Sequence, residues 1–108
     1  MCNEDKILHH TKNGKVIWCP HCDSMQLDYK IVQLSFQSVH LSQFLEKIEA
    51  DLEEAELLNR SDVNFQFATP VKSIQLKFTK AELIELQDLV SISLLQRSLK
   101  KMFIDASA

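Results

Sequence analysis

Residues 32–57 read VQLSFQSVHLSQFLEKIEADLEEAEL, and the spacing of their apolar residues changes once along the stretch. Val32, Leu34 and Phe36 alternate with polar residues, which indicates a half-buried β-strand. From Val39 onward an apolar residue returns every third or fourth position, which indicates a helix with one apolar stripe. The stripe consists of Leu41, Phe44, Leu45, Ile48, Leu52 and Ala55. The stretch therefore predicts a strand followed directly by an amphipathic helix.

A similar pattern occurs again later in the chain. IQLKF at 74–78 matches VQLSF at 32–36, and the apolar positions of the residues that follow also correspond. Another strand-like piece precedes each match, at 25–29 and at 63–67. Each half thus reads strand, strand, helix, which is compatible with a ββα duplication. Unrelated amphipathic segments can align equally well, so duplication and coincidence have equal weight.

The second helix begins at a recognisable signal. Thr79 and Glu82 have the spacing of a capping box, in which each side chain binds a backbone N–H at the start of a helix. The apolar residues that follow, to about Phe103, cover more than one stripe. We therefore expect this helix to be central in the fold or to form an oligomer interface.

Size and composition favour one α+β domain spanning 1–108, with an antiparallel sheet covered by the two helices. The chain has 108 residues, of which 45% are hydrophobic and 25% charged. Within the domain we expect a hairpin with a Cys/His site at 1–30 and strand-helix units at 31–59 and 72–104.

Asn-Gly at 13–14 contains the only glycine of the chain and suits a two-residue type I′ turn. That turn would join strands at 7–12 and 15–19 into a hairpin. In this register His10 lies opposite Ile17 and shares a face with Cys19. The pattern therefore predicts that this imidazole and this thiol lie on the same side of the hairpin.

Residues 19–22 read Cys-Pro-His-Cys, a C-x2-C pair whose two thiolates can reach one zinc ion from a tight turn. A structural zinc site needs four ligands, so two more must come from elsewhere. We predict a Cys3His site, with His9 as the alternative to His10. Its ligands would be Cys2, His10, Cys19 and Cys22.

Two resemblances bear on this motif. VIWCPHC at 16–22 resembles the knuckle of zinc-ribbon and rubredoxin-like proteins, which implies two thiolates supplied by a hairpin turn. The chain lacks a second C-x2-C knuckle, and Asp23 stands where ribbons usually have a small residue. The residues from Trp18 also resemble the Trp-Cys-x-x-Cys motif of thioredoxin-like proteins, which implies Cys19 as attacking thiolate and Cys22 as resolving thiol. The surrounding elements depart from that family, so we favour zinc and keep a thiol-disulfide oxidoreductase as the alternative.

The chain as a whole resembles a small uncharacterised bacterial family with an N-terminal Cys, an Asn-Gly pair and a C-x2-C motif, a resemblance that implies no activity. A net charge of −3 and a pI near 5.7 argue against nucleic-acid binding. No apolar run is long enough to span a membrane, and MCNEDK does not read as a signal peptide, so we expect a cytoplasmic protein.

Our functional hypothesis is a zinc-binding interaction or oligomerisation module, not an enzyme, which binds an unidentified protein partner or itself. Thiol redox chemistry is the one enzymatic alternative, because a chain with a single glycine cannot build a glycine-rich phosphate loop. A metal-responsive regulator with an exchangeable ion is a further hypothesis.

Overall fold

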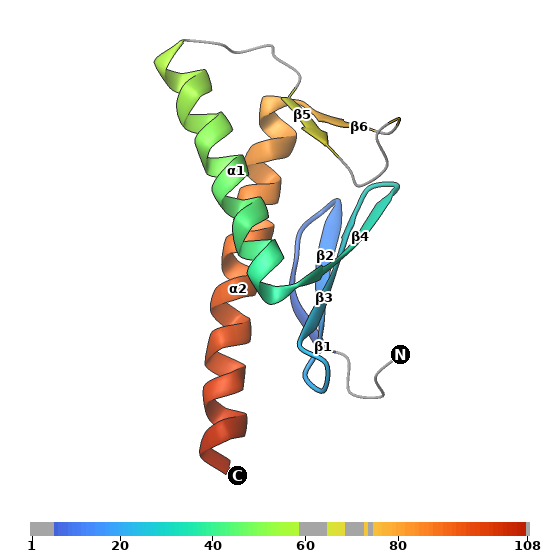
Figure 1. The fold of residues 1–108 in the computed structure, drawn as a ribbon, viewed down its shortest axis with the longest axis vertical. Helices are drawn as coiled ribbons and strands as arrows, with labels where there is room; N and C mark the ends of the chain where they lie inside the picture. The colour runs from blue at the N-terminus through green and yellow to red at the C-terminus, as the bar shows by residue number, and fades with distance from the viewer. Residues whose placement is uncertain (1–5, 59–64, 69–72, 74, 108) are drawn as a thin grey trace.

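The computed structural model describes residues 6–58, 65–68, 73 and 75–107 and has an α+β fold (Figure 1). The strands are β1 (Lys6–His10), β2 (Gly14–Cys19), β3 (Ser24–Tyr29), β4 (Val32–Gln37), β5 (Phe65–Ala68) and β6 (Gln75–Phe78). The helices are α1 (Ser38–Leu57) and α2 (Lys80–Ser107). The predicted class, an antiparallel sheet with two helices, is confirmed.

The strands form two sheets. Strands β1 to β4 make an antiparallel meander in chain order, whereas β5 and β6 pair only with each other among the described strands. The strand predicted at 63–67 is observed as β5, with residues 63 and 64 outside the described part of the chain. Both halves thus have ββα order, but the first hairpin extends a four-stranded sheet and the second forms a small separate one. The pattern of the sequence does not distinguish these two arrangements.

Helix α1 follows β4 without a loop, as the change of apolar spacing predicts. Leu41, Ile48 and Ala55 are its buried residues, and their spacing of seven places them on one face. The opposite face carries the acidic residues and is exposed. The predicted apolar stripe is confirmed.

Helix α2 begins at the predicted capping box. The Thr79 backbone N–H donates to Glu82 Oε1 over 2.8 Å, and the Glu82 backbone N–H donates to Thr79 Oγ1 over 3.2 Å. The helix is 28 residues long, and its inner face packs on β1, β2 and α1. The expected central position of this helix is confirmed, and the alternative, an oligomer interface, stays a prediction.

An aromatic chain connects the two sheets. Phe44 on α1 stacks on Phe36 of β4 at 5.3 Å between ring centroids, and it meets Phe67 of β5 edge-on at 5.3 Å. Phe67 then contacts Phe78 at 5.6 Å, and Phe78 contacts Tyr29 of β3 at 6.1 Å. Phe67 and Phe78 therefore belong to the core, and Phe36 and Phe44 pack against it.

The apolar residues alternate in one phase up to Tyr29 and in the other phase from Val32, because the chain turns between them. Lys30 has φ 54°, and Tyr29 pairs with Val32 across a two-residue turn. The chain reverses here, so Met25 to Tyr29 and Val32 to Phe36 are neighbouring strands rather than one bent strand.

The predicted Asn-Gly turn is wrong. The loop consists of residues 11–13, closed by a hydrogen bond from the Thr11 N–H to the Gly14 carbonyl oxygen at 2.8 Å. Gly14 already belongs to β2, and its φ is not positive. As a result His10 pairs with Lys15 instead of Ile17, and a register shift lies between Ile7 and His9.

Close packing explains the glycine. A Cβ on Gly14 would lie 2.5 Å from the Asp28 carbonyl oxygen, 3.0 Å from the Tyr29 ring and 3.1 Å from a methyl group of Leu89. Position 14 is therefore where β2 passes between β3 and α2, and only a residue without a side chain fits there.

We expect Gly14→Ala to lower the free energy of unfolding by about 1–3 kcal/mol, because overpacking against a backbone atom outweighs the smaller entropy of the unfolded chain. Urea unfolding monitored by circular dichroism measures it. Lys15→Ala, at the neighbouring exposed position, is the control and should change stability by less than about 0.5 kcal/mol. Equal stability of the two variants would show that the close approach is not real.

Candidate functional site

The C-x2-C motif forms the turn between β2 and β3. Cys19 ends β2 and pairs with Ser24, the first residue of β3, so residues 20–23 make the tight connection. Asp23 adopts φ 52°, a left-handed conformation that carboxylate and amide side chains tolerate better than most. Cys19 is buried at 7% exposure, whereas Cys22 is exposed. The motif thus lies on a sharp turn, as a knuckle requires.

Asp23 fastens this turn to the rest of the molecule. Its carboxylate accepts hydrogen bonds from the Trp18 indole N–H at 2.9 Å and the Ser38 hydroxyl at 3.2 Å. Arg97 of α2 donates to both carboxylate oxygens, with Nε 2.9 Å from Oδ1. The guanidinium of Arg97 is the main cause that lowers the pKa of Asp23 to about 2. Sequence reasoning noted Asp23 only as a departure from the ribbon pattern and missed this role.

The two cysteines of the turn have different surroundings. The sulfur of Cys19 is part of a disulfide, and Cys22 Sγ lies 3.1 Å from Ser24 Oγ. Cys2, the third predicted thiol ligand, lies outside the described residues. Zinc binds the thiolate form of cysteine, so a zinc site that includes Cys19 requires the reduced protein.

The predicted closeness of His10 to Cys19 is wrong. His10 pairs with Lys15, which precedes Cys19 by four residues on β2. The position of His10 is therefore about 13 Å from that of Cys19 along the strand. A thiolate and an imidazole on one tetrahedral zinc have their donor atoms only about 4 Å apart. The shifted register therefore places His10 at the far end of the hairpin from the C-x2-C turn.

His9, the alternative ligand, faces helix α2. Its Nε2 lies 3.4 Å from Asp88 Oδ2, and its partner across the hairpin is Val16. Within the described part of the chain, no three His, Cys, Asp or Glu side chains form a group that could hold a metal ion.

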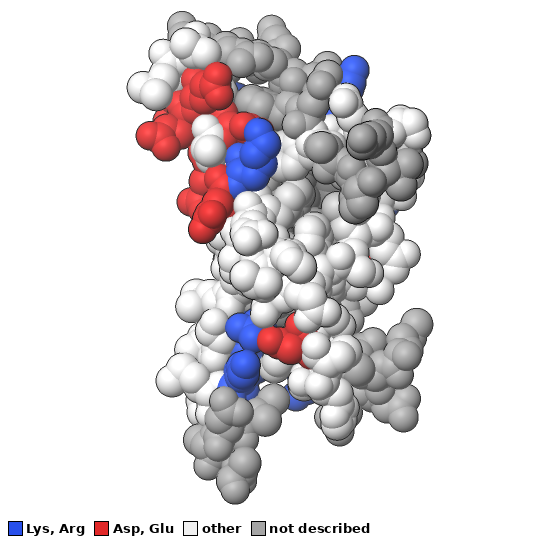
Figure 2. Space-filling view, in the orientation of Figure 1, with Lys and Arg blue, Asp and Glu red and all other residues white. Residues whose placement is uncertain are grey.

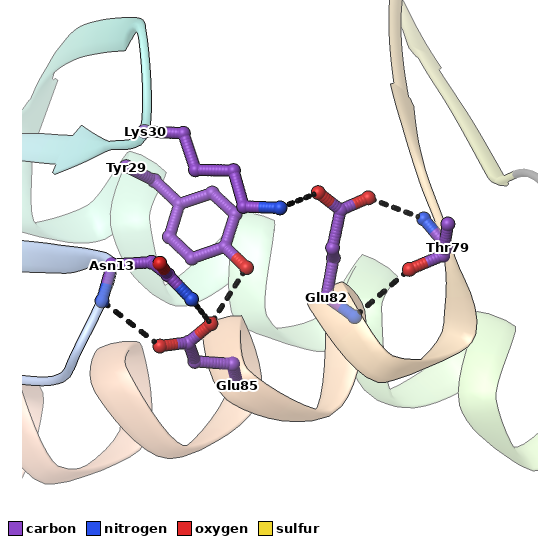
Figure 3. A network of polar contacts seen from close by, with 6 residues as sticks. All are labelled: Asn13, Tyr29, Lys30, Thr79, Glu82 and Glu85. Carbon is purple, nitrogen blue, oxygen red and sulfur yellow. Dashed lines mark hydrogen bonds and ion pairs between the residues drawn. The ribbon is translucent and has the colours of Figure 1, made fainter.

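A second polar cluster lies at the opposite end of the sheet and is centred on Glu85 of α2 (Figure 3). Glu85 accepts hydrogen bonds from the Tyr29 hydroxyl at 2.7 Å and the Asn13 side-chain amide at 2.9 Å. Beside it, Lys30 Nζ lies 2.6 Å from Glu82 Oε2. The cluster thus joins the β1–β2 loop and the β3–β4 turn to the first turns of α2.

The protonation states of this cluster indicate a structural role. Hydrogen bonding, first from Asn13, lowers the pKa of Glu85 to about 2, so it is ionised at neutral pH. Burial, together with the neighbouring Glu85, raises the pKa of Tyr29 above its usual value, so the phenol keeps its proton and donates. Neither group can act as a base or nucleophile without losing its partner. The sequence carries no local signal for this cluster, because Tyr29 and Glu85 are far apart in the chain.

The fold and its turns define a small α+β protein with a two-cysteine turn at one end of its sheet and the polar cluster centred on Glu85 at the other. The chain belongs to a family of unknown function (DUF6686), which it matches over residues 1–107. The expected resemblance to a small uncharacterised family is thereby confirmed. No curated protein and no solved structure matches the chain. No helix in the described residues is long and apolar enough to cross a membrane.

Stability should depend on acid through Asp23 and Glu85. Each carboxyl group has a pKa of about 2 in the folded protein, below the ordinary value for its type. Its contribution to the free energy of unfolding is therefore complete above about pH 5 and is lost as the pH falls toward 2. We expect Asp23→Asn to cost about 2 kcal/mol at pH 7 and to make the acid-induced fall in Tm shallower.

Thermal unfolding followed between pH 7 and pH 2 tests this dependence. Asp51→Asn is the matched control, since the ion pair of Asp51 is with Lys47, one turn away within the same helix. This variant should leave both the Tm at pH 7 and the slope of Tm against pH nearly unchanged. An acid profile for Asp23→Asn that parallels the wild type would contradict the assigned role of Asp23.

Proposed function

We propose that this chain is a small interaction module that associates with itself through the outward face of α2. The observation that carries the proposal is the exposure of Leu95 (58%), Leu99 (43%) and Met102 (67%) in the C-terminal half of that helix. Monomeric proteins seldom leave contiguous large apolar side chains in water, and such patches mark association sites.

The spacing of these residues fits a helix as the partner. Ile92, Leu95, Leu99 and Met102 follow one another at intervals of three, four and three residues, the spacing of the apolar positions in a coiled coil. Ile92 is half-buried, and the other three are exposed. A second helix laid on this stripe would remove the side chains from water and gain about 25 cal/mol for each Å² of apolar surface covered.

Sedimentation velocity over a concentration series tests self-association. We expect the wild type to form dimers and Leu99→Glu to dimerise at least about tenfold more weakly, because it places a charge in an apolar contact. Ile31→Glu removes a fully exposed apolar side chain that belongs to the β3–β4 turn and not to α2, and should dimerise like the wild type. A wild type that stays monomeric at every concentration contradicts the proposal.

A second candidate function is structural zinc binding at the β2–β3 turn, for which the anchored geometry of the turn is the supporting observation. Asp23 holds the turn against Trp18 and Arg97. The two cysteines of the turn are therefore positioned before any ligand arrives. In the reduced protein, Cys19 and Cys22 would be two thiolate ligands and Cys2 a third. His10 is not part of this proposal, because of its place at the other end of the hairpin. Thiol-disulfide exchange by the same cysteines is the alternative use of the turn.

Native mass spectrometry of untagged protein, purified under reducing conditions without added metal, decides between the two. We expect one zinc per chain in the wild type and in Ser24→Ala, and a loss of zinc with a lower Tm in Cys22→Ser. Ser24→Ala is the control, since it changes the neighbour of Cys22 without removing a thiolate. Metal-free wild-type protein would refute zinc binding, and insulin reduction by that protein but not by Cys19→Ser would then assign the turn to redox chemistry.

A further inference from the structure

We propose that two copies of the chain pair antiparallel along α2, with the C-terminal half of each α2 lying in a groove between α1 and α2 of its partner. The proposal rests on the self-association proposed above and adds the orientation and the docking site. In Figure 1, α1 runs beside the N-terminal half of α2, and the C-terminal half of α2 continues past the point where α1 begins. Each copy therefore has both a paired half and an unaccompanied half of the same helix.

The groove lies between the N-terminal half of α2 and the C-terminal half of α1. It has a volume of about 310 Å³, with apolar lining from Leu52 and Ile84. Glu49, Glu53 and Glu56 stand along its α1 side. Lys80 and Gln87 line its α2 side. An occupant that fits this groove is therefore an apolar helix edge with positive charge on the side toward α1.

The C-terminal half of α2 has these properties. Leu99 and Met102 form its exposed apolar edge, and Arg97, Lys100 and Lys101 are its basic residues, with no acidic residue from 97 to 103. Arg97 is paired with Asp23, which leaves Lys100 and Lys101 for a partner. Lys101 is exposed.

The helical repeat places the groove and the apolar edge on one face of α2. Met102 follows Ile84 by 18 residues, about five turns of 3.6 residues, and Leu95 follows it by about three turns. If two such helices lie antiparallel with their crossing point near Ser93, Ile84 of each copy meets Met102 of the other. The same apolar contact then forms at both ends, as a two-fold axis requires.

Charge selects this orientation over the parallel one. Between residues 46 and 56, α1 carries six acidic residues and Lys47, whereas the basic residues of α2 gather toward its C-terminal half. Figure 2 shows the acidic side chains over α1 and a separate basic group over the lower part of α2. A parallel pair would bring like charges together at each end, which is unfavourable. The antiparallel pair places Lys101 of one copy beside the acidic side of the partner's groove.

Charge reversal tests the docking site. We expect Lys101→Glu and Glu53→Lys each to weaken dimerisation about tenfold, and the two changes in one chain to restore it to within about threefold, since the pair is re-formed with opposite signs. Lys77→Glu, an equal charge change at an exposed position of β6, should leave dimerisation unchanged. If the double variant dimerises as weakly as the single variants, the docking of α2 against the partner's α1 is overturned.

Cross-linking tests the orientation. Positions 84 and 102 are about 27 Å apart along α2, so neither Ile84→Cys nor Met102→Cys alone should form a disulfide across an antiparallel pair. A mixture of the two variants should form one between position 84 of one copy and position 102 of the other, identified by peptide mapping. Disulfides that join 84 to 84 or 102 to 102 would refute the antiparallel geometry and leave self-association intact, whereas a monomeric wild type would remove both proposals.

Discussion

The contact between Asp23 and Arg97 is the interaction on which the arrangement of this protein depends. One carboxylate receives hydrogen bonds from Trp18 on β2, from Ser38 at the start of α1 and from Arg97 on α2. Sheet and both helices therefore meet at a single charged group. Because Arg97 and Asp23 satisfy each other, the charge is tolerated in a partly buried position, and its loss would leave an arginine without its partner against the sheet.

The Glu85 cluster has the same effect at the other end of the sheet. It joins the loop that contains Asn13 and the strand end at Tyr29 to the first turns of α2. With Arg97 and Glu85 both bound to the sheet, α2 is held at two points along its length. Its outward face, with the exposed side chains of Leu95 and Met102, is the face that the proposed self-association would use.

The sequence was informative where short-range physics decides structure. The capping box at Thr79 and the apolar stripe of α1 depend on residues within one or two helical turns, and both are confirmed. The Asn-Gly pair led to a wrong turn prediction, because a glycine can be required either for a positive φ or for its lack of a side chain. At position 14 it is the lack of a side chain that matters. The observed register differs from the predicted one by two residues and places His10 far from Cys19.

By itself, then, the sequence determined the α+β class, both helices and the C-x2-C turn, since these follow from spacing along the chain. Tertiary structure alone decided which strands share a sheet, that Asp23 and Glu85 are the anchors of α2, and which side of α2 remains exposed. The physical reason is that these features depend on partners far apart in the chain, such as Asp23 with Arg97 and Tyr29 with Glu85. Periodicity indicates that a face is apolar, but only packing determines whether that face is buried within the chain or left for a second molecule.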